Sequence, residues 1–155
     1  MTKKKLASAK GLCSLGIILA YAAFCAFFFT YGRFAVQRAA NEMNEQQTLG
    51  GLGAAFAYVY ALVFLLAFAV PTILFLISTI GNLTKKGEKL VGFTVVSLVA
   101  EILGMIALFL TAVFFMAATL YDILSVVAMA VFFLLVLIGF IHSITVLSKA
   151  KKAED

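Results

Sequence analysis

Four long runs of apolar residues, separated by short polar or basic segments, divide the chain. They cover about residues 11–30, 53–80, 90–118 and 123–147. Each run reaches the roughly 20 residues that an α-helix needs to cross about 30 Å of hydrocarbon. The pattern predicts an all-α, polytopic membrane protein with a single domain over residues 1–155, folded as an antiparallel bundle of four transmembrane helices.

The composition agrees with this pattern. Apolar residues make up 65% of the chain and charged residues 12%, with a mean hydropathy of +1.14, which is outside the range of soluble domains. Four lysines precede the first run, as they would in a signal peptide. Its apolar part is nevertheless longer than the roughly 7 to 15 residues of a signal peptide. We therefore expect a retained first span.

The basic residues are distributed unevenly between the two predicted sides of the membrane. Four of the 12 precede the first run, three lie between the second and third runs, and three follow the fourth, whereas Arg33 and Arg38 fall on the other side. Because short loops rich in Lys and Arg stay in the cytoplasm, both termini are predicted to be cytoplasmic, with segments 31–52 and 119–122 outside. The net charge of +5 also implies a weak attraction to anionic lipid head groups, and no aromatic–basic pattern indicates nucleic acid.

The sequence contains no recognisable arrangement for catalysis. Cys13 and Cys25 are separated by about 18 Å of helical rise, too far for a disulfide between them. There is no Cys-x-x-Cys pair, His/Cys cluster, Gly-rich phosphate loop or Gly-x-Ser-x-Gly motif. We therefore predict no catalytic residue, no metal and no cofactor, and an enzyme is the least supported class.

The predicted outer segment, 31–52, is rich in good helix formers. Arg38 lies four residues before Glu42, the spacing of a stabilising ion pair on a helix. Three glycines, at positions 50, 51 and 53, end this helical pattern before the second run. The segment is the largest one predicted outside the bilayer, so it is a candidate surface for a partner.

Small and polar residues form one stripe on each of the last two predicted helices. At about 100° per residue, each stripe lies within an arc of roughly 100°. Membrane helices pack and hydrogen-bond along such stripes, because lipid tails give apolar faces no reason to associate. The stripe of the third helix consists of Thr94, Ser97, Glu101, Gly104 and Thr111, and that of the fourth of Ser125, Ala128, Gly139, His142 and Ser143.

Glu101 lies within a strongly apolar run, and His142 is the only histidine. The third and fourth runs are joined near Tyr121 and Asp122 by a turn so short that they must form an antiparallel hairpin. Glu101 and His142 are equally far from this turn, which predicts that they face one another. Measured from the flanking lysines, their depths differ by about 7 Å. The turn is the better measure, because it is a covalent link and lysine side chains snorkel.

Two interpretations of Glu101 follow. A bare carboxylate near the bilayer midplane costs about 2.5–3.5 kcal/mol, so Glu101 should be protonated, paired or in contact with water inside an assembly. In the simpler interpretation, a neutral Glu101 hydrogen-bonds His142 or a neighbouring hydroxyl and fixes the helix register. In the functional interpretation, the pair is a proton or cation site, because histidine exchanges protons near neutral pH and a carboxylic acid does so when burial raises its pKa.

Pro71 is the only proline, and it lies within the second run. A proline inside a helix removes one N–H donor, which would free the carbonyl of Ala67 and produce a kink. Thr72 is the neighbour that could satisfy the freed backbone. Most prolines in membrane helices only bend them.

Two classes of function remain. The favoured one is a non-catalytic interaction partner, subunit or scaffold in a plasma membrane of bacterial type. It would bind another membrane protein or a second copy of itself through the stripes and the outer segment. The alternative is a small transporter or channel component with Glu101 as its proton or cation site. That component would have to be oligomeric, because four helices enclose little space. A face with several charges would have favoured transport, and Glu101 is the one acid within these runs.

Overall fold

The structure is a computed structural model of the 155-residue chain. In the part of the chain that it describes, it contains four α-helices and no strand: α1 (Lys3–Phe27), α4 (Ala69–Thr84), α5 (Leu90–Thr119) and α6 (Ile123–Lys152). The prediction of an all-α fold is confirmed for these residues. The described residues are 2–27, 30–31, 41, 59, 62, 66–84, 88–119 and 123–152.

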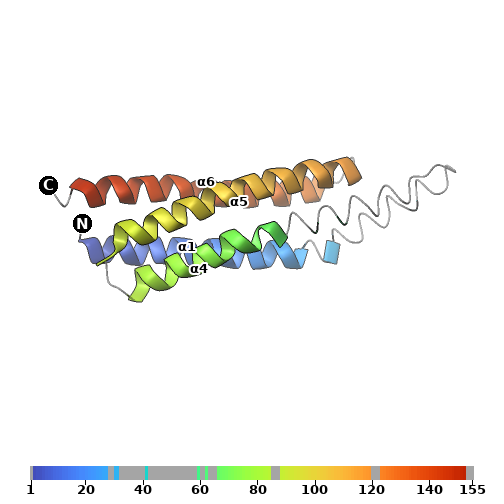
Figure 1. Cartoon of the computed structure of the whole chain (residues 1–155). Helices are drawn as coiled ribbons and strands as arrows, with labels where there is room; N and C mark the ends of the chain where they lie inside the picture. Colours follow the sequence, from blue (N-terminus) through green and yellow to red (C-terminus); the bar gives the residue numbers. More distant parts are fainter. Residues whose placement is uncertain are drawn as a thin grey trace.

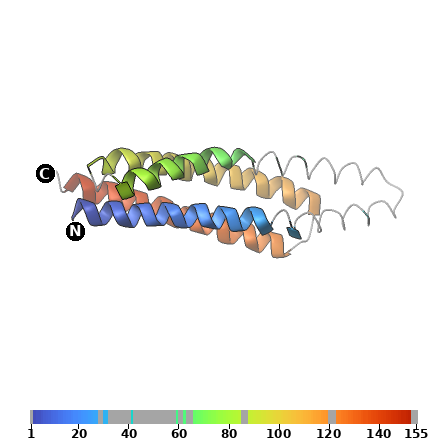
Figure 2. The same ribbon diagram turned by 90° about the horizontal axis from the view of Figure 1, so that it is seen from below.

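The four described helices form one elongated bundle (Figure 1). α1 packs against α4 and α6, and α5 also packs against α4 and α6, so that α1 and α5 lie on a diagonal of the bundle with fewer contacts between them. The N-terminus and the C-terminus lie at the same end, as both views show (Figure 1 and Figure 2). Any group that joins α1 to α5 must therefore cross the centre of the bundle.

Three of the described helices are long and apolar enough to cross a membrane. The candidate spans are Lys3–Phe27, Leu90–Val113 and Val126–Lys151. α4 is apolar but has only 16 residues, fewer than the roughly 20 that a span requires. The first part of the predicted second span, 53–65, lies mostly outside the described residues, so the full length of the span, 53–80, stays a prediction.

Two helices are longer than the apolar runs indicated. α1 begins at Lys3 rather than near residue 11, and α6 continues to Lys152 rather than ending near residue 147. The added turns consist mostly of alanine and lysine, which are both good helix formers. Hydropathy therefore marked the apolar part of each helix, while helix propensity extended the helix beyond it.

Among the described residues, ten polar or charged side chains are buried inside the bundle, while many large apolar side chains are exposed on its outside. Leu19, Ile73, Phe109 and Ile138, one from each helix, expose more than half of their surface. In water such a surface would be strongly unfavourable, whereas lipid tails solvate it well. This inside-out distribution supports a membrane-embedded protein. The buried polar residues are Lys10, Ser14, Ser78, Thr79, Asn82, Thr94, Ser97, Glu101, Thr111 and Ser143.

Two apolar clusters fill the rest of the described interior. In the larger one, the rings of Phe24 and Phe132 are stacked with 5.2 Å between centroids, and the half-buried Tyr21 packs against Phe68 in a tilted arrangement at 4.7 Å. The smaller cluster ties the start of α1 to the start of α5 and the end of α6. It consists of Leu6, Ala7, Leu90, Val146 and Ala150.

Pro71 is buried in the first turn of α4. There its missing N–H costs little, because the first N–H groups of a helix have no helical partner. The helical pattern is interrupted at Phe68, and the N–H and hydroxyl of Thr72 donate to the carbonyl of Phe68 at 3.1 and 2.9 Å. Thr72 thus satisfies a different carbonyl from the expected Ala67. The preceding residues are described only in part, so the kink itself stays a prediction.

Candidate functional site

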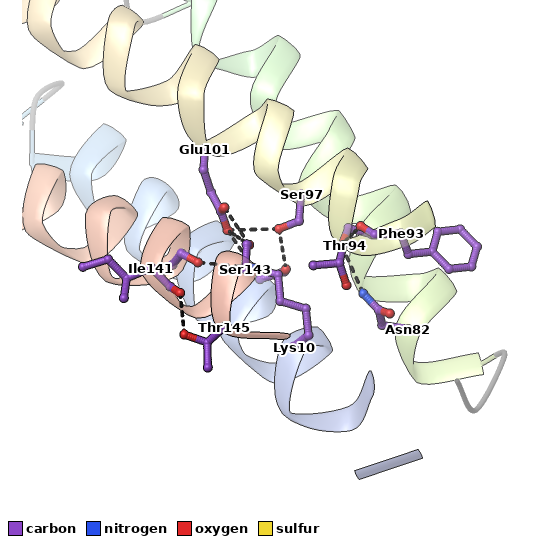
Figure 3. Close-up of polar contacts among 12 residues, drawn as sticks. Lys10, Asn82, Phe93, Thr94, Ser97, Glu101, Ile141, Ser143 and Thr145 are labelled. Atoms are coloured by element: carbon purple, nitrogen blue, oxygen red, sulfur yellow. Dashed lines mark hydrogen bonds and ion pairs between the residues drawn. The ribbon is translucent and has the colours of Figure 1, made fainter. Parts of the chain in front are cut away.

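Glu101 forms an ion pair with Lys10 in the interior of the bundle. The Lys10 Nζ lies 2.6 Å from the Glu101 Oε1, and neither side chain is exposed. Lys10 comes from α1 and Glu101 from α5, so the pair joins the two diagonal helices (Figure 3). Either charge alone would be costly inside a membrane, and pairing cancels the net charge. Of the three states expected for Glu101, the structure therefore has the paired one.

Two serine hydroxyls also donate to the same carboxylate. Ser97, one helical turn before Glu101, donates to Oε1 at 3.1 Å. Ser143 of α6 lies 2.9 Å from Oε1 and 2.7 Å from Oε2. Hydrogen bonds to an ionised carboxylate are roughly twice as strong as neutral ones. The carboxylate therefore connects three helices, α1, α5 and α6.

Ser14 of α1 is linked to the Glu101 carboxylate through Ser97. The Oγ atoms of Ser14 and Ser97 are 3.3 Å apart. A hydroxyl carries a single hydrogen, and that of Ser97 is directed to Glu101. Ser14 is therefore the donor, and the hydrogen bonds run from Ser14 through Ser97 to the carboxylate.

Gly139 allows α6 to approach the ion pair closely. Its carbonyl oxygen lies 3.5 Å from the Lys10 Nζ. A Cβ at this position would be 2.6 Å from the Cδ1 of Ile17 and 3.2 Å from the Glu101 Oε1. A larger residue would therefore displace the end of the Ile17 side chain and crowd the carboxylate, so the glycine has a packing role.

The two predicted stripes are used mainly for packing inside the chain. Gly104 is buried against Phe68, where a Cβ would lie 2.7 Å from the phenylalanine Cε2. The hydroxyls of Thr94 and Thr111 bond to carbonyls of their own helix, at 2.7 and 2.8 Å. Ala128 is half-buried, and the side chain of Ser125 lies outside the described part. The buried members are Thr94, Ser97, Glu101, Gly104, Thr111, Gly139 and Ser143.

His142 takes a different place from the one expected. In the described part of the chain, its Nδ1 is buried without a hydrogen-bond partner, and no hydrogen bond joins it to Glu101. The adjacent Ser143 contacts the carboxylate instead. Successive residues on a helix differ by about 100° in direction, so Ser143 and His142 cannot both point at Glu101. The hairpin therefore predicted the depth at which α6 meets Glu101. The rotation of α6 brings Ser143, rather than His142, to the carboxylate.

Lys10 is the functional residue that the sequence reasoning missed, because it was grouped with the basic residues flanking the first span. The sequence nevertheless contained a pattern that indicates the burial of Lys10. On a helix, Lys10, Gly11 and Ser14 lie on one face, and Ala7 extends this face toward the N-terminus. The test for small and polar stripes, applied to α1, would have placed Lys10 inside the bundle.

A separate polar contact fastens α4 to α5. Ser78 donates to the carbonyl of Phe93 at 2.9 Å, and the Asn82 amide donates to Ser78 at 3.2 Å. Within the described residues, the Asn82 Oδ1 and the Thr79 Oγ1 are buried without a partner. All four described helices are thus joined by polar contacts in the half of the bundle that carries the termini.

The described contacts at the site are an ion pair and hydrogen bonds within the chain. The carboxylate already accepts from an ammonium and two hydroxyls of its own chain. An external cation would have to displace Lys10 to bind. Among the described residues, no group of three or more His, Cys, Asp and Glu could hold a metal, and Cys13 and Cys25 are half-buried free thiols.

Comparisons of the chain with protein-family models, with curated proteins and with solved structures found no match. The class that the fold and the site define is a helical membrane bundle with a buried Lys–Glu ion pair. Its function is therefore argued from this geometry.

Proposed function

We propose that this chain is a polytopic protein of a bacterial-type plasma membrane, an antiparallel bundle of four transmembrane helices with both termini in the cytoplasm. It acts as a non-catalytic interaction partner, subunit or scaffold in a membrane assembly. The observation that supports this role is the Glu101 carboxylate, whose charge is neutralised by Lys10 and whose oxygens accept hydrogen bonds from Ser97 and Ser143.

The surroundings of the ion pair favour a structural role over transport. A transported proton or cation has to reach the carboxylate from one side of the membrane and leave it on the other. Along each helix that contributes to the site, apolar cluster residues lie before and after the polar ones. They are Ala7 and Ile17 on α1, Leu90 and Ala107 on α5, and Val136 and Val146 on α6. The charges therefore serve to hold the helices in one arrangement.

This arrangement leaves the outer faces for partners. The buried members of the small and polar stripes pack within the chain, which favours other surfaces for a second protein. The remaining candidates are the exposed apolar helix faces and the predicted outer segment, 31–52, which lies largely outside the described residues. A scaffold with a rigid interior and an apolar exterior suits association within the bilayer.

The alternative function is a small oligomeric transporter or channel component that uses Glu101 as a buried proton or cation site. One observation favours it: the Nδ1 of His142 is buried without a described partner, one residue from Ser143. An ionisable group in that situation can mark a proton path. The experiment that separates the two functions compares proton and cation flux in proteoliposomes of the wild type and of a folded variant without the Glu101 charge.

Cysteine labelling tests the proposed topology. In a variant lacking Cys13 and Cys25, a cysteine introduced by Gln46→Cys should react with an impermeant reagent only from outside, and one introduced by Lys86→Cys only from inside. The reason is the concentration of ten of the 12 basic residues on one predicted side. Labelling of either position from the opposite side would contradict the proposed orientation.

Substitutions in the outer segment test the partner-binding role. Arg38→Ala/Glu42→Ala should reduce the amount of partner, or of second copy, that co-purifies in mild detergent by several-fold. The melting temperature should barely change, because an exposed (i, i+4) pair contributes only about 0.2–0.5 kcal/mol. The matched control is Lys4→Ala/Glu88→Ala, which removes two exposed charges of opposite sign near the termini. A wild-type chain that purifies only as a monomer without a partner would refute the role.

A further inference from the structure

Lysines from three separate segments gather at the end of the bundle where both termini lie. Lys3, Lys4 and Lys5 begin α1, Lys89 directly precedes α5, and Lys149 and Lys151 lie in the last turns of α6. Figure 1 shows that the start of α1, the start of α5 and the end of α6 lie at the same end of the bundle. The smaller apolar cluster holds these three helix ends together. The only acid described at this end is Glu88. We call the six lysines the basic end.

A small pocket opens within the basic end, with a volume of about 100 Å³. Because a water molecule occupies about 30 Å³, the pocket can admit a group of several heavy atoms. A Cβ on Gly92 would meet nothing within 4 Å, so this wall of the pocket is open. Its lining includes Lys3, Glu88, Lys89, Leu90, Gly92 and Ala150.

The position of the pocket relative to the candidate spans indicates which kind of ligand reaches the pocket. Two of these spans begin at Lys3 and Leu90, and the third ends at Lys151. The pocket therefore lies at the boundary between hydrocarbon and water, at the level of lipid head groups. A solute there competes with phospholipids, which are present at far higher local concentration. Lysine ammonium groups at this depth attract anionic head groups and donate hydrogen bonds to phosphate oxygens.

We propose that the basic end binds the phosphate of an anionic phospholipid, held in this pocket between Lys3 and Lys89. Lys4, Lys5, Lys149 and Lys151 add to the attraction from around it. Glu88, which also lines the pocket, accepts a hydrogen bond from a head-group hydroxyl, and this favours a glycerol head group. The site goes beyond the proposed scaffold role and does not depend on the identity of a protein partner.

The test is a lipid titration of the purified full-length chain in neutral detergent, followed by native mass spectrometry. Phosphatidylglycerol should bind at least tenfold more tightly than phosphatidylcholine with the same acyl chains, and added salt should reduce the difference. Lys3→Gln/Lys89→Gln should weaken phosphatidylglycerol binding roughly tenfold or more, since it removes two head-group contacts. Phosphatidylcholine, whose choline cation cancels the charge of its phosphate, should lose much less binding.

The matched control is Arg33→Gln/Arg38→Gln, which removes the same charge at the predicted opposite end and should leave the lipid preference intact. An equal loss in this control would overturn the assigned location. Equal binding of the two lipids by the wild type would overturn the proposal. So would displacement of phosphatidylglycerol by inorganic phosphate at the same concentration, because the ligand would then be the free ion. If Lys3→Gln/Lys89→Gln does not fold, Lys89→Gln alone takes its place, with an expected loss of about fivefold because it removes one of the two head-group contacts.

Discussion

Lys10→Met is expected to lower the free energy of unfolding by about 3–5 kcal/mol, because it leaves the Glu101 carboxylate buried without its counter-charge. The ammonium and carboxylate are 2.6 Å apart and fully buried, so no solvent screens the loss. Methionine has a similar length to lysine and fills most of its space. The expected loss of stability therefore comes from the missing charge rather than from a cavity. Equilibrium unfolding of the purified chain in mixed micelles measures it.

Two further variants are the controls for this measurement. Lys5→Met removes the same charge from an exposed position on the same helix and should change stability by less than about 0.5 kcal/mol. Lys10→Met/Glu101→Gln removes both charges, and replacing a buried ion pair by neutral groups is often close to neutral. The double variant should thus recover most of the stability lost in Lys10→Met. A Lys10→Met variant as stable as Lys5→Met would show that the ion pair does not form.

The helices and their buried faces were largely predictable, because both follow from repeating patterns. Apolar runs marked α1, α5 and α6, and the arc calculation placed Ser97, Glu101 and Ser143 on interior faces, where the structure buries them. These positions are periodic along a single helix. Neither prediction required knowledge of which helices are neighbours.

The partner of Glu101 was less predictable, because it depends on the arrangement of separate helices. The hairpin of α5 and α6 gave a depth for Glu101 relative to α6, but no rotation of α6. The predicted partner His142 and the observed partner Ser143 are neighbours in the sequence, so their side chains differ by about 100° around the axis of α6. Lys10 lies 91 residues away in sequence on the diagonal helix, and no short connection sets its depth against α5. Lys10 was also grouped with the three lysines before it, because a count of basic residues does not distinguish buried lysines from exposed ones.

The burial of Lys10 bears on the topology argument as well. Counting basic residues assumes that each one lies in a loop or at a membrane surface. Lys10 contributes to the core contact with Glu101, so it is a weaker topology signal than the exposed Lys4 and Lys5. Nine basic residues still remain on the side predicted to be cytoplasmic. The predicted orientation therefore does not depend on Lys10.

Glu101→Gln is expected to lower the free energy of unfolding by about 3–5 kcal/mol, because it leaves the Lys10 ammonium buried without a counter-ion. If Glu101 were only a neutral hydrogen-bonding group, as in the simpler interpretation of the sequence, this substitution would be nearly neutral, since an amide retains a donor and an acceptor. The structure reverses that expectation by supplying a charged partner. The loss should disappear largely when Lys10→Met is added, and the coupling between the two substitutions measures the pair directly.

The same double variant separates the two proposed functions. A single Glu101→Gln chain that lacks flux could simply be misfolded, whereas Lys10→Met/Glu101→Gln should remain folded without either charge. For a scaffold, this variant should retain its partner, and proteoliposomes of the wild type and the variant should have the same background proton and cation flux. For a transporter, the wild type should carry a flux that the folded double variant has lost. Such a loss would refute the scaffold role and assign transport to Glu101. His142→Asn would then test whether the neighbouring imidazole carries the proton.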